Sequence, residues 1–258
     1  MASEKMELVF LGTGTSHGVP MIGCDCPVCR SPDPRDRRNR AAVVVRAGGQ
    51  VVLIDTPPEL RLAAVACGLK RLDAICFTHS HADHIMGLDD VRRFNDLMGK
   101  TIPCYANAVT IRRLREAFGY AEVGYDAAPT YRPSLRFELI DGPFAIGGLE
   151  ITPVPLLHGD DEVLGFRIGR MAYCTDCSAI PESSRPLLAD LELLVLDALR
   201  HTPHPTHFTL AEALEVIAEL RPKRALLTHM THELPHEETN RSLPAGVELA
   251  YDGLRVTV

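Results

Sequence analysis

The sequence predicts a layered α/β domain, because segments typical of strands alternate with segments typical of helices along the whole chain. Short apolar runs bounded by Gly, Pro and Asp recur from end to end, and runs with helical periodicity lie between them. Tight turns join strands at comparable places in both halves, and no Ser-rich or charge-rich linker separates the halves. We therefore expect residues 1–258 to form one domain.

The expected strands are short and apolar, and Gly-Gly or Gly-Arg turns follow several of them. They are residues 7–11, 41–46, 51–54, 72–77, 102–105, 137–140, 150–157, 164–168, 191–196, 224–227, 247–251 and 254–258. The turns at 47–50, 147–148 and 169–170 are typical of hairpins.

The expected helices are residues 59–66, 88–98, 108–118, 183–189 and 209–220. The last one has the clearest boundaries, because Thr209 begins a Thr-Leu-Ala-Glu capping box and Pro222 follows its end. Two stretches lack a regular pattern, namely 23–40, which is rich in Cys, Pro and Arg, and 119–134. We expect both to be functional or surface loops.

Composition excludes several classes of protein. The 258 residues carry 27 Lys and Arg against 34 Asp and Glu, a formal charge of -7, which argues against nonspecific binding to nucleic acid or to an anionic membrane. No apolar run approaches the roughly 20 residues needed to cross a bilayer, and the first residues lack the apolar centre of a signal peptide. We expect a cytoplasmic protein without a membrane partner, with reduced thiols and no disulfide framework.

The chain is rich in His and Cys, with 11 and 8 respectively, and this combination points to metal binding. The strongest motif directly follows the expected strand 72–77 and contains His79, His81, Asp83 and His84. Three imidazoles and a carboxylate within six residues cannot share one helix face, but a tight loop at a strand end can bring them to two neighbouring metals.

Three further candidate ligands, His158, Asp176 and His229, also follow strand-like runs. Each of them alone is more often a structural residue. Together with the first motif they give the set of ligands that a two-metal site needs, all at strand ends along one edge. The mixture of imidazole and carboxylate suits Zn, Mn or Fe.

A second motif, Cys24-x-Cys26-x-x-Cys29, is too tightly spaced for internal disulfides but suits one zinc ion. A tetrahedral site needs a fourth ligand, for which His232 is the candidate. Because His232 lies three residues after His229, one loop could serve both metal sites with the two side chains pointing apart.

The ligand motifs, in this order, resemble the five-motif signature of the metallo-β-lactamase superfamily over nearly the whole chain. The resemblance implies a four-layer αβ/βα sandwich with metals between the sheets and a zinc-binding insertion at 23–40. It also implies that Asp55, at the end of the strand 51–54, orients the loop of His ligands. By similarity, one metal would be held by His79, His81 and His158, the other by Asp83, His84 and His229, with Asp176 bridging them.

The Cys loop and the His three residues after the last active-site ligand resemble the phosphoribosyl 1,2-cyclic phosphate phosphodiesterase branch, which carries a structural zinc there. Segments 11–20 and 246–253 extend this resemblance. In this branch a His at the start of the late helix lies near the substrate, and the matching residue is His207. It would bind the phosphate and protonate the leaving alkoxide, and Asp83 is also counted as catalytic. Alternatively, His207 only precedes the helix that Thr209 caps.

We therefore expect a dinuclear metal-dependent phosphodiesterase with two Mn or Zn ions in the active site and one structural Zn. Its substrate would be a small anionic phosphodiester, with phosphoribosyl 1,2-cyclic phosphate favoured. In the expected mechanism a metal-bridging hydroxide attacks phosphorus while the metals stabilise the developing charge.

Three alternatives remain open. A nuclease of the RNase Z or exonuclease type is disfavoured by the acidic balance, the absence of Trp and the 5% aromatic content. An accessory protein of pyrroloquinoline quinone biosynthesis would have a similar fold and Cys loop. A non-catalytic zinc module would require that the ordered ligand motifs serve structure alone.

Several other residues receive a provisional interpretation. We expect the arginines of 35–40 (Arg35, Arg37, Arg38 and Arg40) to form an exposed loop against the zinc site, and Arg92 and Arg93 to be solvated on a helix. Cys67, Cys76, Cys104, Cys174 and Cys177 fall in or beside apolar runs and are expected to be core thiols. No role is assigned to His17, His201, His204 or His236, and a homodimer is left open.

Overall fold

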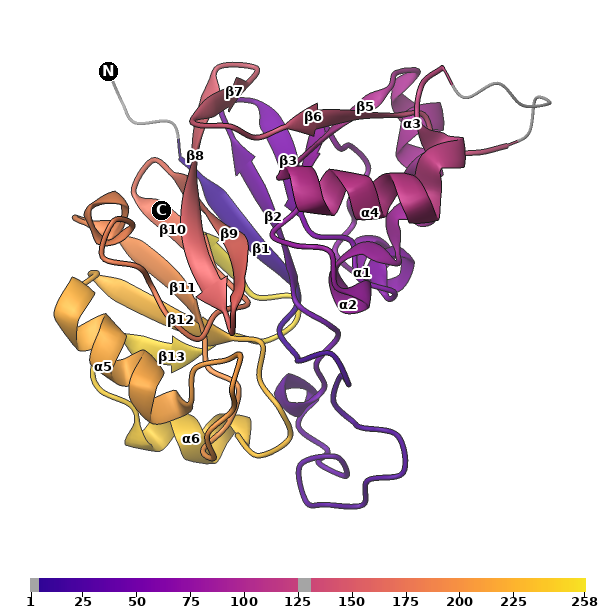
Figure 1. Cartoon of the computed structure of the whole chain (residues 1–258). Coiled ribbons are helices and arrows are strands. Elements are labelled where there is room, and N and C mark those ends of the chain that lie inside the picture. Colours follow the sequence, from indigo (N-terminus) through magenta and orange to yellow (C-terminus); the bar gives the residue numbers. More distant parts are fainter. Residues whose placement is uncertain (1–4, 125–130) are drawn as a thin grey trace.

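The computed structural model describes residues 5–124 and 131–258, and these residues form two seven-stranded sheets packed face to face (Figure 1). The first sheet has the order β14-β1-β2-β3-β4-β5-β6 and the second has the order β13-β12-β11-β10-β9-β8-β7. The first-sheet strands are β1 (Glu7–Gly12), β2 (Ala42–Ala47), β3 (Gln50–Ile54), β4 (Ala74–Cys76), β5 (Ile102–Ala106), β6 (Leu135–Leu139) and β14 (Arg255–Thr257). The second-sheet strands are β7 (Phe144–Ile146), β8 (Leu149–His158), β9 (Asp161–Ile168), β10 (Met171–Cys174), β11 (Leu193–Asp197), β12 (Arg224–Thr228) and β13 (Val247–Leu249).

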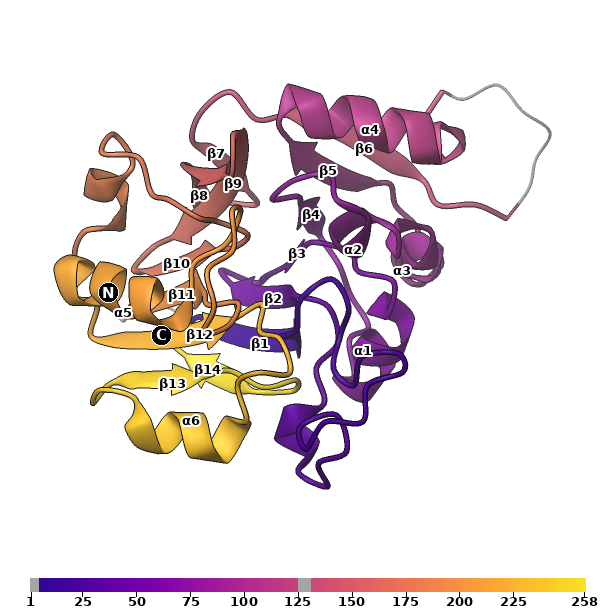
Figure 2. The same ribbon diagram turned by 60° about the horizontal axis from the view of Figure 1, so that its bottom comes forward.

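Helices cover the outer face of each sheet, which gives four layers (Figure 2). The first sheet packs against α1 (Leu60–Ala66), α2 (Ala82–Ile85), α3 (Arg92–Met98) and α4 (Ala108–Phe118). The second sheet packs against α5 (Leu210–Leu220), and α6 (His236–Ser242) lies beside β13. This arrangement confirms the predicted αβ/βα sandwich. No described helix is both long enough and apolar enough to span a membrane.

The central strands are apolar on both faces because each face packs against a different layer. In β1, Leu8 and Phe10 belong to the core between the sheets, while Val9 and Leu11 face the helices of the first layer. Both sets of side chains are at most 2% exposed. For this reason the central strands appear in the sequence as continuous apolar runs rather than as alternating ones.

Three details of the predicted elements are corrected by the structure. The expected helix 183–189 is only a 3₁₀ turn, Arg185–Leu188, because Pro186 lacks the N–H that a longer helix would use. Strand β7 and helix α6 were not expected, since β7 is very short and α6 is polar almost throughout. Part of the irregular stretch 119–134 lies outside the described residues.

Candidate metal centre

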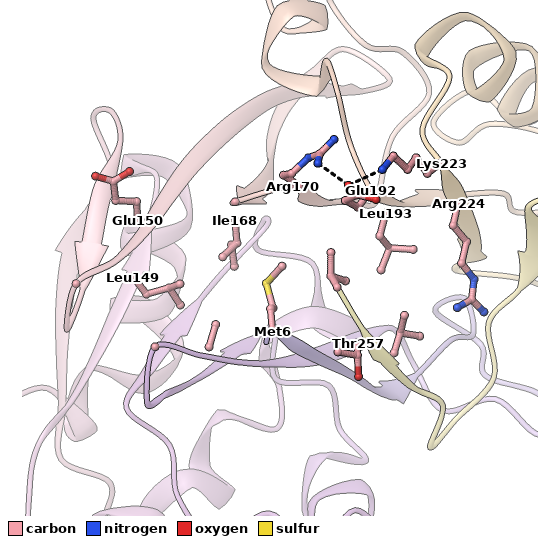
Figure 3. A pocket seen from close by; sticks show the side chains of 16 residues that line it. Met6, Leu149, Glu150, Ile168, Arg170, Glu192, Leu193, Lys223, Arg224 and Thr257 are labelled. Atoms are coloured by element: carbon pink, nitrogen blue, oxygen red, sulfur yellow. Dashed lines mark hydrogen bonds and ion pairs between the residues drawn. The ribbon is translucent and has the colours of Figure 1, made fainter. Parts of the chain in front are cut away.

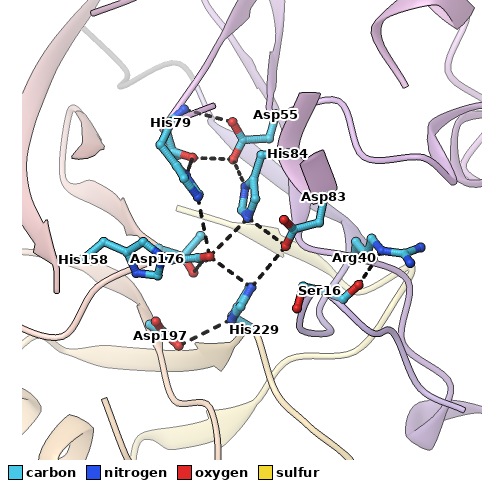
Figure 4. A network of polar contacts seen from close by, with 12 residues as sticks. Ser16, Arg40, Asp55, His79, Asp83, His84, His158, Asp176, Asp197 and His229 are labelled. Carbon is cyan, nitrogen blue, oxygen red and sulfur yellow. Dashed lines mark hydrogen bonds and ion pairs between the residues drawn. The ribbon is translucent and has the colours of Figure 1, made fainter. Parts of the chain in front are cut away.

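The predicted ligands come together at the carboxyl ends of strands from both sheets (Figure 4). The loop after β4 and the short helix α2 carry the first four, and the ends of β8, β10 and β12 carry the others. In the second sheet, β10, β11 and β12 are parallel, so their carboxyl ends reach the same edge. The structure therefore brings together seven candidate ligands: His79, His81, Asp83, His84, His158, Asp176 and His229.

The first group of ligand atoms consists of imidazole nitrogens from His79, His81 and His158, all within 4.8 Å of one another. His158 donates its Nδ1 hydrogen to the carbonyl oxygen of Thr206 at 2.7 Å, so the lone pair that can bind a metal is on Nε2. His79 and His158 are each only 5% exposed, whereas His81 is exposed and forms the open side of the group.

The second group consists of Asp83, His84, Asp176 and His229. The Oδ2 atom of Asp176 lies 3.2 Å from Nε2 of both His84 and His229, and 3.8 Å from Nε2 of His79 in the first group. Asp176 therefore stands between the two groups, and it is buried, at 2% exposed. This is the position that a carboxylate shared by two metals would take.

Asp55 fixes the loop that carries the first motif. Its carboxylate is fully buried and accepts hydrogen bonds from Thr78 N at 2.9 Å, from Thr78 Oγ1 at 2.7 Å and from His84 Nδ1 at 2.8 Å. The bond to Nδ1 directs Nε2 of His84 toward Asp176. Asp55 has a φ of 66°, a left-handed backbone that is uncommon for a residue other than glycine and is often found at functional sites.

The buried imidazoles lack the partners that neutral side chains normally find in a protein core. Among the described residues, Nε2 of His79, Nε2 of His84 and both ring nitrogens of His229 make no hydrogen bond, and their contacts to the carboxylates of Asp176 and Asp197 span 3.2–3.9 Å. An unpaired buried polar group costs about 1–3 kcal/mol, so such a cluster is explained by groups that it binds. Burial lowers the pKa of His79 well below its ordinary value and that of His158 to about 4, which keeps both in the neutral form that binds metal. The donor set therefore fits two divalent cations.

His207 lies at the edge of this centre, with its ring centroid 4.6 Å from that of His158 and 4.7 Å from that of His229. Its Nδ1 hydrogen-bonds Oδ2 of Asp197 at 2.7 Å. Asp197 was not predicted as a site residue, although it follows the apolar run 191–196 just as the other site residues follow theirs. Asp197 Oδ2 also accepts from Cys177 N at 2.9 Å, and Oδ1 lies 3.9 Å from His229 Nδ1. Burial raises the pKa of Asp197 and lowers that of His207.

The second predicted metal site is also assembled. Nδ1 of His232 lies 3.2, 3.4 and 3.5 Å from the sulfur atoms of Cys24, Cys26 and Cys29. Zinc bound tetrahedrally, at about 2.3 Å from sulfur and about 2.0 Å from nitrogen, places these atoms about 3.5 Å apart. The four side chains therefore fit one zinc ion. His229 and His232 belong to separate clusters although only two residues separate them.

The arginines of the insertion correct one expectation. Arg38 is not exposed: at 2% exposure it donates to the carbonyl oxygens of Thr231 at 2.6 Å and Leu234 at 2.5 Å, and so holds the loop that carries His232. Arg40 lies beside the metal centre, where it donates to Ser16 O at 2.7 Å (Figure 4). It also pairs with Glu59.

Several other residues with a provisional interpretation lie on the surface or in the core. Arg35 pairs with Asp33 and Glu237, Arg92 pairs with Asp89, Arg93 pairs with Asp96, and His17 is exposed. All eight cysteines are free. Four of the five expected core thiols are buried, and Cys67 is half-buried against the first core.

A large hollow of about 880 Å³ lies at the other end of the sandwich, near the start of β11 and β12 (Figure 3). Its charged groups are partly neutralised, since Arg170 and Lys223 both pair with Glu192. None of its lining residues is His, Cys or Asp. A smaller hollow of about 590 Å³ adjoins the metal centre and is lined in part by His79, His81 and His158. The smaller hollow is therefore the candidate substrate-binding site.

Comparisons with known proteins agree with this geometry. A family model described as Beta-lactamase superfamily domain matches residues 50–230. A solved structure described as a new diphosphatase from the PhnP family is 46% identical with a TM-score of 0.92, covering 98% of this chain and 97% of that one. Zinc-bound PqqB from Methylobacterium extorquens shares the fold, with a TM-score of 0.81 at 18% identity, covering 98% of this chain and 100% of that one.

The curated relatives include longer and more distant proteins. An octanoyltransferase of Porphyromonas gingivalis strain W83 is 34% identical over an alignment of 258 positions, which covers 98% of this chain and 52% of that protein. This chain thus spans about half the length of that relative. A ribonuclease Z of Bradyrhizobium sp. strain ORS 278 is 36% identical over 84 residues, 32% of this chain and 23% of that protein.

Proposed function

This chain belongs to the metallo-β-lactamase superfamily and, within it, to the PhnP family, and on that basis we propose that it hydrolyses a small phosphodiester at a two-metal centre. The observation that supports this most directly is the position of Asp176. One oxygen of this buried carboxylate faces imidazoles of both ligand groups. We assign His79, His81 and His158 to one metal, Asp83, His84 and His229 to the other, and Asp176 to both.

When bound, two divalent cations would supply positive charge beside the phosphoryl oxygens and lower the pKa of water at the site. The chain itself holds the ligands in place before substrate arrives. Asp55 orients His84, and the carbonyl of Thr206 orients His158. Such preorganisation avoids rearrangement during the reaction.

His207 is the residue that we assign to proton transfer. Because Asp197 binds its Nδ1, the Nε2 atom is the one that can donate a proton to the leaving oxygen. The hydrogen bond to Asp197 fixes the ring. Burial raises the pKa of this carboxyl, but an imidazolium formed on His207 during the step would favour the anionic form of Asp197 and be stabilised by it. Asp197 therefore positions His207, which is the group that would touch substrate.

The favoured substrate remains phosphoribosyl 1,2-cyclic phosphate. A second candidate reaction is cleavage of a diphosphate linkage, which is supported by the PhnP-family relative described as a diphosphatase at 46% identity. In either reaction water attacks phosphorus and a phosphate-bound oxygen leaves. We assign one structural zinc to Cys24, Cys26, Cys29 and His232.

The test uses purified protein reconstituted with Mn or Zn. Substrates are bis-p-nitrophenyl phosphate, phosphoribosyl 1,2-cyclic phosphate, a dinucleoside diphosphate, cyclic nucleotides, single-stranded RNA and a thioester. We expect phosphodiester or diphosphate cleavage that is abolished in Asp176→Asn and retained in Glu150→Gln, which removes an exposed carboxylate at the far end of the sandwich. If neither metal supports cleavage of any phosphorus substrate, the proposal is wrong, and salt-sensitive cleavage of RNA alone would favour the nuclease alternative.

A further inference from the structure

The hollow beside the metal centre has features that binding of metals alone does not explain. Its volume of about 590 Å³ falls within the range of small-molecule sites, roughly 300–1,000 Å³. It reaches the centre itself, because its lining includes His79, whose buried Nε2 makes no hydrogen bond to any described residue. It also extends beyond the centre, between the first turns of α4 and the turn that joins β8 to β9. A substrate bound at the metals would therefore have its remaining part in this space.

The wall formed by α4 is electropositive. Val109, Thr110 and Arg113 all line the hollow, since residues three and four positions apart share one helix face. The N–H groups of the first turn of α4 point toward the same end of the helix, where they favour negative charge. Within the described part of the chain, Arg113 forms an ion pair with the exposed Glu116, at 2.8 Å, and an exposed pair of this kind contributes little to stability. A ligand anion can therefore take the place of Glu116 at little cost.

The opposite wall is acidic and limits what the hollow accepts. Asp161 and Glu162 line it from the start of β9, and both residues are exposed. Two carboxylates facing the positive wall would repel an extended polyanion but can accept hydrogen bonds from sugar hydroxyl groups. Its lining residues, among those the structure describes, include no Phe, Tyr or Trp, so imidazoles are the only rings there on which a base could stack. The chemistry fits a hydroxylated molecule with one anionic group and disfavours a nucleobase.

We propose that this hollow holds the part of the substrate that is not cleaved, and that Arg113 selects sugar phosphodiesters carrying a second phosphate there. The inference rests on the proposed function, because it places the reacting phosphorus at the metal centre. It adds a residue, outside both ligand groups, that determines specificity.

The experiment compares two substrates that differ only in the second phosphate, phosphoribosyl 1,2-cyclic phosphate and ribose 1,2-cyclic phosphate. It uses the metal-reconstituted wild type, Arg113→Gln and the matched control Arg112→Gln, which removes the same charge from the neighbouring position outside this hollow. We expect Arg113→Gln to lower the ratio of kcat/KM for the two substrates by about 10- to 100-fold, mainly through KM. Arg112→Gln should leave the ratio unchanged. Equal ratios in all three proteins would overturn the inference.

A binding measurement separates this inference from the proposed function. Ribose 5-phosphate is titrated into each protein by calorimetry, with no reaction required. Weaker binding to Arg113→Gln than to wild type and Arg112→Gln supports the hollow as the phosphate subsite, even if the wild type cleaves neither cyclic substrate and the proposed reaction fails. Equal binding to all three, together with wild-type cleavage, overturns the inference and leaves the proposed function intact.

Discussion

The hydrogen bond between His207 and Asp197 provides the sharpest test of proton transfer. Asp197→Asn keeps the shape of the side chain, and its amide oxygen can still accept from His207 Nδ1 and Cys177 N, which now lie 2.7 and 2.9 Å from Oδ2. What the substitution removes is the negative charge. The variant should therefore fold and bind metal normally while stabilising the protonated imidazole less well.

The expected loss follows from the strength of that contact. A hydrogen bond to a charged partner contributes about 1.5–3 kcal/mol, and a neutral one about 0.5–1.5 kcal/mol. The mid-points of these ranges differ by about 1.2 kcal/mol, which corresponds to a roughly eightfold lower kcat when protonation of the leaving oxygen limits the rate. The loss should be near zero for p-nitrophenolate, a good leaving group that needs no proton.

The assay measures kcat of wild type and Asp197→Asn with phosphoribosyl 1,2-cyclic phosphate and with bis-p-nitrophenyl phosphate. Metal content is determined by mass spectrometry in parallel. A loss confined to the alkoxide-leaving substrate supports proton transfer by His207. Equal losses with both substrates, or a loss of metal, would refute the reasoning and assign Asp197 to ligand support through His229.

Three further predictions concern packing, zinc and pH. Gly87→Ala should lower the free energy of unfolding by about 1–3 kcal/mol in urea titrations, because the added Cβ would lie 2.0 Å from Pro57 O. The control Gly142→Ala, whose Cβ would enter open space, should change the free energy of unfolding by less than about 0.5 kcal/mol. Similar effects of the two substitutions would contradict this prediction. Cys26→Ser should lower the zinc content by one ion per chain and lower the Tm, whereas the control Cys67→Ser should keep the wild-type zinc content. An unchanged zinc content in Cys26→Ser would exclude the assigned site. Burial raises the pKa of Asp252 to about 7, above the unfolded value of about 3.9. The contribution of this carboxyl to stability is therefore complete below pH 4 and declines as the pH rises to 7, by at most about 4 kcal/mol. Asp252→Asn should therefore lose less stability than wild type between pH 5 and pH 8, and equal losses would show that this carboxyl does not titrate in that window.

The ligand positions could be predicted because they depend on a general property of sheets. Parallel strands end at one edge, so polar residues that follow apolar runs, such as His158 and His229, were expected to meet there. The structure places them together, and it places Asp176 between the two groups. A layered α/β domain was also predictable, since the alternation of strands and helices extends through both halves. The four layers followed only from the resemblance to the superfamily.

Asp197 and helix α6 could not be identified in the same way. One Asp after an apolar run does not show which side chain it will face, and the partner of Asp197 comes from a loop ten residues later. Helix α6 lacks an apolar stripe, and its first N–H is bound by Asp36 of the distant insertion. Arg38 was expected on the surface with the other arginines of 35–40, but it is buried, at 2% exposed. Its carbonyl partners belong to a loop nearly 200 residues away, which no local pattern predicts.

The pairing of Met6 with Val258 has a practical consequence for engineering. These residues exchange backbone hydrogen bonds, from Met6 N to Val258 O at 3.2 Å and from Val258 N to Met6 O at 2.9 Å, and both line the large hollow at the end of the sandwich opposite the metals. A peptide linker between them could close the backbone into a ring, and new termini could then be opened in a surface turn such as 147–148. A reporter protein attached at this end would stand well clear of the entrance used by substrate.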